Sequence, residues 1–175
     1  TTSGGTVVDL TTQTIKANTT YYAVFTATTN KYTIIWKNAD GTVLETDKNV
    51  AHGAMPTYNG TTPSKTGYTF SWSPSIASVT ADATYTATYT ANTYTIAFNA
   101  NGGSGTMADQ EFPYGVSNTL TSNAFTRTGY TFAGWTTNAN GTGTSYTNTQ
   151  NVSNLANTEG AEVIIYAKWT AITYT

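Results

Sequence analysis

The stretch ATYTATYTA at residues 83–91 alternates threonine with tyrosine or alanine along its whole length. A two-residue period is typical of a β-strand that buries one face. Two further stretches share the pattern, TTYYAVFTA at 19–27 and VIIYAKWTA at 163–171. The pattern therefore predicts the same strand three times. The predicted inner positions are Tyr21, Ala23 and Phe25 in the first copy, Tyr85, Ala87 and Tyr89 in the second, and Ile165, Ala167 and Trp169 in the third.

A second strand motif follows each of these stretches almost at once. It reads KYTIIWKN at 31–38, TYTIAFNA at 93–100 and ITYT at 172–175. A third phrase recurs after each full copy of this second motif and before the next copy of the first. It reads GYTFSW at 67–72 and GYTFAGW at 129–135. Repetition of several motifs in one order indicates tandem structural repeats. The predicted inner positions of the second motif are Tyr32, Ile34 and Trp36, matched by Tyr94, Ile96 and Phe98.

This order of motifs divides the chain into four segments. We expect residues 1–29 to be the C-terminal half of a repeat module and 30–91 a full module of a short variant. Residues 92–171 are predicted to be a second full module, and 172–175 the start of the next module's first strand. The expected fold is mainly β, in small tandem modules of mostly antiparallel strands with at most one short helix each.

Turn signals separate the predicted strands. Asp40-Gly41 lies between two strand-like runs and is a strong hairpin signal. NANGGSG at 99–105 predicts the corresponding turn of the second full module. TQNVSNLANTEG at 149–160 predicts a short helix with Val152 and Leu155 facing inward, ended by Gly160.

The composition excludes several classes of protein. Charged residues make up only 9% of the chain, against about 25% in ordinary soluble domains. The abundant aromatic and β-branched residues argue against disorder. A net charge of −2 with scattered lysines offers no surface for nucleic acid or anionic membrane, and no run is apolar enough for a membrane-spanning helix. The absence of cysteine excludes disulfides and thiolate metal sites.

No arrangement of residues predicts a catalytic site, a cofactor site or a metal site. The one histidine, His52, has no nucleophile motif near it and is interpreted as a loop residue. Asp40, Glu45 and Asp47 offer oxygen ligands for calcium, but their spacing is not that of an EF-hand loop. We interpret them as an acidic edge beside the Asp40-Gly41 hairpin.

Other polar groups have simpler interpretations as surface. Lys37 and Lys168 are candidates for an isopeptide bond to asparagine, but they fall on the faces predicted to meet solvent. Alternate threonines from Thr84 to Thr90 resemble an ice-binding array on one strand only. The Asn-x-Ser/Thr sequences at Asn18, Asn59, Asn140 and Asn151 matter only in a host that glycosylates.

The aromatic residues suggest either a core or a platform for stacking sugars. Those that recur in both full modules are predicted to form the core: Tyr68, Phe70 and Trp72, and Tyr130, Phe132 and Trp135. Aromatics without a counterpart are the better candidates for sugar binding, namely Tyr58, Tyr114 and Tyr146. The ligand-binding residues, if the chain binds a ligand, are not identified by the sequence.

The motifs together resemble a known family, the Listeria–Bacteroides repeat, also described as the B-repeat of internalin B. The resemblance lies in YTIAFNANGG at 94–103, GYTFAGW at 129–135, NVSNL at 151–155 and IIYAKWT at 164–170. It covers 93–171 well and 31–91 in a variant form, in which Ser71-Trp72 replaces the Ala-Gly-Trp phrase. The resemblance implies a compact β-grasp-like module, in tandem, on an exported bacterial surface protein, with no catalytic residues.

We therefore expect a structural segment of an extracellular bacterial protein, acting as a spacer, a stalk or an adhesin. Its expected partners are neighbouring modules of the same protein, and any export signal or anchor is expected outside this chain. Two alternatives remain open. In the first, the chain is a filament subunit whose half-modules complete one another by strand exchange. In the second, it is a binding module for a host glycan or host protein.

Overall fold

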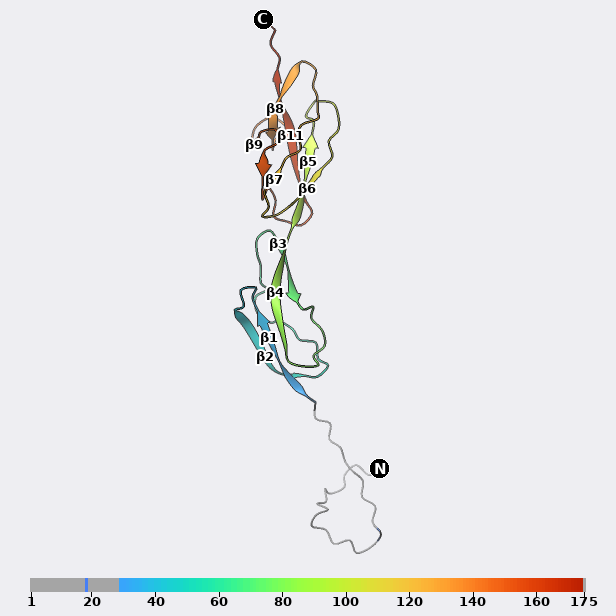
Figure 1. Cartoon of the computed structure of the whole chain (residues 1–175), viewed down its shortest axis with the longest axis vertical. Coiled ribbons are helices and arrows are strands. Elements are labelled where there is room, and N and C mark those ends of the chain that lie inside the picture. Colours follow the sequence, from blue (N-terminus) through green and yellow to red (C-terminus); the bar gives the residue numbers. More distant parts are fainter. Residues whose placement is uncertain (1–17, 19–28, 175) are drawn as a thin grey trace.

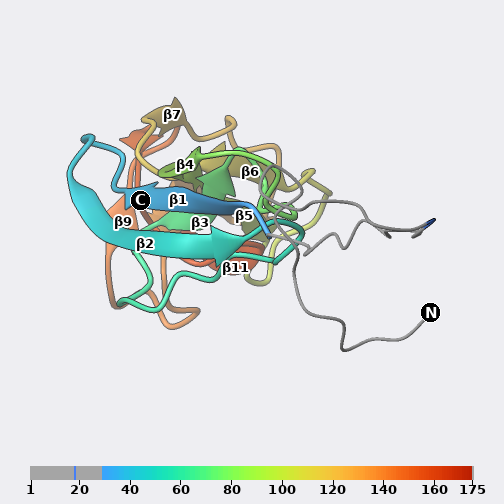
Figure 2. The ribbon, with the colours of Figure 1, turned by 90° about the horizontal axis from the view of Figure 1, so that it is seen from below.

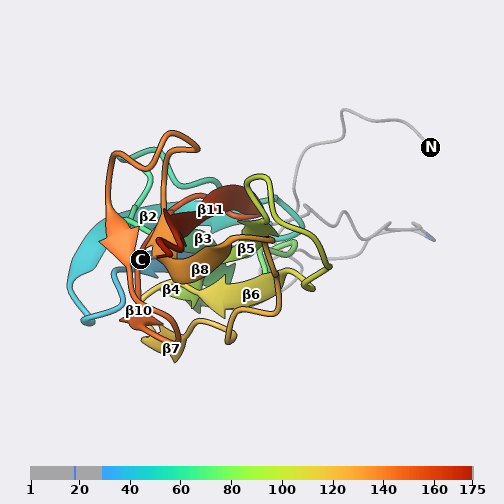
Figure 3. The same cartoon turned by 90° about the horizontal axis from the view of Figure 1, so that it is seen from above.

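The computed structural model describes residue 18 and residues 29–174. Two β-sheets lie end to end along the long axis of the molecule, and the chain passes from β4 of the lower sheet directly into β5 of the upper one (Figure 1). Seen along that axis from either end, the two sheets overlap (Figures 2 and 3). We call residues 31–91 the first unit and residues 93–171 the second unit.

The first unit is one mixed four-stranded sheet. Its strands are β1 (Lys31–Lys37), β2 (Val43–Ala51), β3 (Tyr68–Ser73) and β4 (Ala83–Ala91), in the order β2-β1-β4-β3. The central pair, β1 and β4, is parallel, and both outer pairs are antiparallel.

The second unit repeats this arrangement and adds to it. Its sheet has the order β6-β5-β11-β8-β9, again with a parallel central pair, β5 and β11. A separate ribbon pairs β7 with β10. The strands are β5 (Thr93–Asn99), β6 (Gln110–Pro113), β7 (Asn118–Thr119), β8 (Tyr130–Thr136), β9 (Ser145–Tyr146), β10 (Asn151–Val152) and β11 (Ala161–Ala171).

The predicted mainly β fold with mostly antiparallel pairing is confirmed. The Asp40-Gly41 turn joins β1 to β2 as expected, with the Gly41 amide donating to the Asn38 carbonyl and the Thr42 amide to the Asp40 carboxylate. The predicted closing strand at 19–27 lies outside the described residues, as does nearly all of the segment 1–29.

The helix predicted at 149–160 is wrong. That stretch contains the short strand β10, and no helix forms anywhere in residues 29–174. Thr149 and Asn154 both have positive φ angles, of 57° and 56°, which interrupt any helical run. The inward prediction for Val152 and Leu155 holds, because Val152 is buried and Leu155 packs against the same core. Burial of two apolar groups three residues apart was therefore achieved by turns rather than by a helix.

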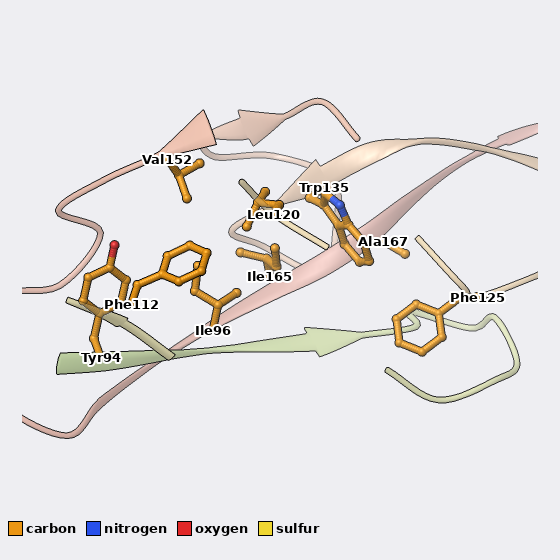
Figure 4. Packing of buried hydrophobic residues seen from close by; sticks show 9 residues of the cluster. All are labelled: Tyr94, Ile96, Phe112, Leu120, Phe125, Trp135, Val152, Ile165 and Ala167. Atoms are coloured by element: carbon orange, nitrogen blue, oxygen red, sulfur yellow. The ribbon is translucent and has the colours of Figure 1, made fainter. Parts of the chain in front are cut away.

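Each unit has a hydrophobic core of its own. In the first unit Trp36 is fully buried and its ring lies 4.8 Å from that of Tyr85 and 4.9 Å from that of Trp72, centroid to centroid. In the second unit Trp135 lies near Ala167 in the middle of a longer cluster that runs between Tyr94 and Phe125 (Figure 4). The buried members of the second core are Tyr94, Ile96, Phe112, Leu120, Phe125, Trp135, Val152, Ile165 and Ala167.

The extra glycine of the second unit has a structural cause. The register between β8 and β11 shifts next to Lys168, whereas β3 pairs with β4 without a shift. Gly134 at this bulge has a φ of 122°, and a Cβ atom there would come within 2.6 Å of the Tyr146 carbonyl oxygen on β9. Only glycine permits that approach. The first unit has Ser71-Trp72 at this place and no strand equivalent to β9.

Candidate functional site: the joint between the two units

A single residue, Asn92, separates the last strand of the first unit from the first strand of the second. β4 ends at Ala91 and β5 begins at Thr93. Asn92 is only 8% exposed, which is unusual for a linker, since connecting segments normally run over the surface. Its burial requires that its polar groups find partners within the protein.

Asn92 divides its hydrogen bonds between the two units. Toward the first unit, its amide donates to the Gly67 carbonyl at 2.9 Å, and its side-chain oxygen accepts from the Thr69 hydroxyl at 2.7 Å. Toward the second unit, its carbonyl accepts from the Tyr114 amide at 2.8 Å, and its side-chain nitrogen donates to the Asn157 carbonyl at 2.8 Å. One residue is thus bound twice to each unit.

Two tyrosines meet beside this linker. Tyr68 at the start of β3 and Tyr114 just after β6 form an edge-to-face pair, with centroids 5.9 Å apart and ring planes at 77°. Such pairs contribute about 0.5–1.5 kcal/mol beyond the area they bury. The Lys65 ammonium lies 3.8 Å from the centre of the Tyr68 ring and adds a cation–π contact.

Glycines allow the segments that carry Tyr68 and Tyr114 to approach each other at this point. Gly67 has a φ of 77°, and a Cβ atom on it would overlap the ring of Tyr114. Gly115 lies against the Tyr68 hydroxyl, where a Cβ atom would be 3.0 Å from the oxygen. The Gly115 amide donates to the Asn154 side chain, which fixes the turn that carries Tyr114.

The start of β5 is held as well. The Glu159 carboxylate accepts from both the amide and the hydroxyl of Thr93, at 2.8 and 3.1 Å. Thr93 directly follows Asn92, so the chain is bound firmly on both sides of the crossing. The arrangement can transmit a fixed angle between the units, because no freely rotating residue lies between them.

Asp40, Glu45 and Asp47, the acidic residues singled out in the sequence, all accept hydrogen bonds from protein groups. Each carboxylate has its own protein donors: Asp40 binds the Thr42 amide, and Asp47 accepts from the Trp36 indole at 2.8 Å. Glu45 accepts from the Asn59 side chain and from the amides of Asn59 and Gly60. These bonds, above all that from the Asn59 side chain, lower the pKa of Glu45. Across residues 29–174, no three His, Asp or Glu side chains are grouped as metal ligands would be.

His52 is an exposed residue in the turn after β2, as interpreted from the sequence. Its ring centroid lies 6.2 Å from that of Tyr32. The His52 amide donates to the Asn30 carbonyl at 2.8 Å, just as the Tyr114 amide donates to Asn92. His52-Gly53 and Tyr114-Gly115 are therefore equivalent turns of the two units, and Gly53 and Gly115 share a φ of 82°.

The three unmatched tyrosines pack against other aromatic or core residues. Tyr58 packs on Trp36 and Trp72, Tyr114 on Tyr68, and Tyr146 against the second core. Burial raises the pKa of Tyr146, and its electrostatic interaction with Tyr94 adds to the effect. All three are half-buried, so each exposes only part of its side chain, and a role for them in sugar binding stays a prediction.

The recurring aromatics divide between the core and the joint. Trp72 and Trp135 pack in the two cores, and Phe70 and Phe132 pack against these tryptophans. Tyr68 and Tyr130 do not belong to either core: Tyr68 contacts the other unit, and Tyr130 is exposed. The core prediction is thus right for the phenylalanines and tryptophans and wrong for the tyrosines of the GYTF phrase.

The remaining groups predicted to meet solvent are exposed or half-buried. Lys168 is exposed and Lys37 is half-buried. Thr84 and Thr90 are exposed, and Thr88 shares a hydrogen bond with Ser71. The side chains of all four asparagines in Asn-x-Ser/Thr sequences, Asn18, Asn59, Asn140 and Asn151, belong to exposed residues.

A polar pocket of about 260 Å³ opens on the second unit. It has two cationic side chains, Arg127 and Lys168, no acidic one, and the indole of Trp169. The amide of Asn101 bridges the carbonyls of Ala139 and Ala167 at its edge. Its lining consists of Asn101, Arg127, Ala139, Asn140, Gly141, Lys168 and Trp169. The sequence did not predict this pocket, because its two cations come from separate motifs.

The joint was also missed by sequence reasoning at the level of residues. The signal was present in TYTANTY at 88–94, where one residue stands between two strand motifs. A one-residue connection predicts a short link, but it does not reveal that the asparagine side chain would be buried and shared.

Residues 94–168 match the family model of the Listeria-Bacteroides repeat domain. The second unit is a Listeria-Bacteroides repeat. Repeats of this family are typical of bacterial surface proteins and are generally structural. A search of curated proteins finds no match to the chain. No helix within residues 29–174 has the length and apolar character needed to cross a bilayer.

Proposed function

We propose that this chain is a non-catalytic segment of an extracellular bacterial surface protein and acts as a spacer whose repeats are held at a fixed angle. The observation that carries the proposal is the linker. Asn92 is buried, all four of its hydrogen-bonding groups are used, and they are shared evenly between the units. A flexible tether would instead expose its linker to water.

The energetics are sufficient for a rigid joint. Each of the four hydrogen bonds contributes about 0.5–1.5 kcal/mol, and the tyrosine pair adds a contribution of similar size. Bending the joint would break several of these contacts together. Such coupling makes the energy of a repeat array the sum of unit and interface terms.

The test compares two glycines in the same local conformation. Gly67 and Gly129 follow Lys65-Thr66 and Arg127-Thr128, with φ angles of 77° and 79°. Alanine is strained at both, by about 1–2 kcal/mol. Only at Gly67 would the new Cβ atom overlap a residue of the other unit, since nothing lies within 4 Å of the Gly129 position. Gly129→Ala is therefore a matched control.

The readout is the distance between spin labels on the two units. The chain has no cysteine, so Thr84→Cys and Thr170→Cys can be labelled uniquely. Both positions are exposed, one on β4 and one on β11. We expect a narrow distance distribution that Gly67→Ala broadens and Gly129→Ala leaves narrow. A broad distribution in the unaltered background would show a flexible tether and overturn the proposal.

The polar pocket favours a second candidate function, binding of an acidic glycan. Arg127 and Lys168 supply positive charge, and the Trp169 ring supplies a face or edge for a sugar. A titration with a glucuronate-containing oligosaccharide, followed by NMR, should shift the Trp169 indole signal. Lys168→Gln should weaken the binding, whereas Lys48→Gln, at an exposed position of β2, should not. Equal effects of the two changes would identify nonspecific attraction.

A further inference from the structure

The turn by which the first unit contributes to the joint has a counterpart at the far end of the second unit. At the first unit's end, the sequence Lys65-Thr66-Gly67-Tyr68 forms a turn in which the Tyr68 amide donates to the Lys65 carbonyl at 3.0 Å. At the second unit's end, Arg127-Thr128-Gly129-Tyr130 forms the same turn, with the Tyr130 amide donating to the Arg127 carbonyl at 3.0 Å.

The contacts around these turns also correspond. Lys65 lies 3.8 Å from the centre of the Tyr68 ring, and the Arg127 guanidinium lies 4.0 Å from the centre of the Tyr130 ring. The residue after the closing strand donates its amide to the glycine carbonyl in both places. Asn92 does so to Gly67 and Ile172 does so to Gly129, each at 2.9 Å.

The two turns differ in what packs over them. Gly67 is buried beneath Tyr114, whereas Gly129 is exposed with nothing within 4 Å of its Cβ position. Tyr130 is 37% exposed and Ile172 is 42% exposed. Within residues 29–174, Tyr68 has an aromatic partner from the neighbouring unit, and Tyr130 has none.

The residues that follow match the start of β5. Ala171-Ile172-Thr173-Tyr174 corresponds to Ala91-Asn92-Thr93-Tyr94. Tyr94 is 1% exposed in the second core, while Tyr174 is 89% exposed. The same position of the repeat is thus buried in one copy and exposed in the other.

We infer that Gly129, Tyr130 and Ile172 form a docking surface for a further repeat unit, one that begins with residues 172–174 as its first strand. Its turn equivalent to Tyr114-Gly115 packs on Gly129 and against the edge of Tyr130, because that is how the equivalent turn packs on Gly67 and Tyr68. The inference rests on the proposed spacer function and extends the same joint to a second position.

This second joint is not identical to the first. Ile172 has no side-chain amide, so it cannot bridge two units as Asn92 does through Thr69 and Asn157. The backbone hydrogen bond and the aromatic contact remain, and the isoleucine adds apolar area at the crossing. We therefore expect the second joint to hold its units at a similar angle and to rely more on apolar packing.

The test uses the full chain, extended by one repeat. Residues 95–171 are appended directly after Tyr174 in place of Thr175, and the appended copy carries the Tyr130→Phe change. Labelling of Tyr130 by tetranitromethane, measured by mass spectrometry, then reports on that residue alone. We expect its labelling rate to fall severalfold compared with the 175-residue chain, to the rate of Tyr68, and Tyr174 to become protected.

The matched control is Gly129→Ala. In the 175-residue chain its Cβ atom meets nothing and should leave the labelling of Tyr130 unchanged. In the extended chain the same Cβ atom should push the docked ring away and restore rapid labelling.

Two outcomes overturn the inference. Equal labelling of Tyr130 in the two chains means that the surface docks no repeat, while narrow spin-label distances across Asn92 would leave the spacer function standing. Protection of Tyr130 in the 175-residue chain that grows with protein concentration means that a second copy occupies the surface in place of a following repeat.

Discussion

At the scale of single residues, polar side chains that face the core stabilise the first unit by satisfying buried hydrogen-bond donors. Asp47 is on the core-facing side of the edge strand β2, opposite Ile34, and accepts a hydrogen bond from the buried Trp36 indole. A charge facing inward on an edge strand also discourages pairing with another chain. The acidic pattern of β2 is therefore structural.

Replacing Asp47 with alanine should lower the free energy of unfolding of the first unit. The Trp36 indole would lose its acceptor while remaining fully buried, at a cost of about 1–3 kcal/mol. Urea denaturation followed by tryptophan fluorescence measures the change. The control is Asp109→Ala, at an exposed aspartate, and a loss of equal size there would contradict the assigned role of the indole bond.

The lowered pKa of Glu45 predicts that acid reduces the stability of the first unit. Its folded-state pKa lies below the ordinary value, so its contribution to stability is present above the unfolded-state pKa and is lost as the pH falls through the folded-state pKa. Between pH 5 and pH 3, taken as about the range around the ordinary pKa of a glutamate, Glu45→Gln should lose less stability than the unaltered chain. Glu162→Gln, on the exposed side of β11, should leave the pH dependence unchanged.

At the scale of strands, one inserted glycine separates the two variants of the repeat. Gly134 lies where β8 shifts register against β11 and lets β9 approach. The shorter first unit needs no such bulge. A difference of one residue in the repeated phrase thus corresponds to a difference of one strand in the sheet.

Gly134→Ala should destabilise the second unit by about 2–4 kcal/mol, because the Cβ atom would collide with the Tyr146 carbonyl and the positive φ adds strain. Gly141→Ala is the matched control, since Gly141 has a φ of 80° and open space around it. Thermal unfolding of the two variants measures the difference. Equal melting temperatures would show that β9 does not pack against this position.

At the scale of the molecule, two separate cores are joined by one shared residue. Among the residues that the structure describes, no buried residue belongs to both clusters. The units should therefore unfold as distinct domains whose stabilities are coupled only through the joint. This organisation suits a spacer, because one unit can open without the other.

Ile165→Ala tests this coupling. Deleting a fully buried isoleucine from the second core should cost that unit about 2–5 kcal/mol. Hydrogen exchange should then show reduced protection in β5, β8 and β11, with much smaller changes in β1 and β2. Equal loss of protection in all five strands would show that the two units form one cooperative domain.

The sequence by itself determined the strands, their inner faces and the repeated order of motifs. These depend on side-chain alternation and turn residues, which are local. The helix predicted at 149–160 failed because an apolar spacing of three residues is compatible with either a helix or two turns, and contacts with β7 decided between them.

Only the tertiary structure decided the role of Tyr68 and Asn92. Nothing in GYTF distinguishes a ring that packs in its own core from one that packs on the next unit, since both lie on the same face of the strand. The burial of Asn92 depends on Gly67, Tyr114 and Asn157 meeting at one point, and these residues are far apart in the chain. Local patterns specify strands, whereas the joint arises from contacts between units that only folding brings together.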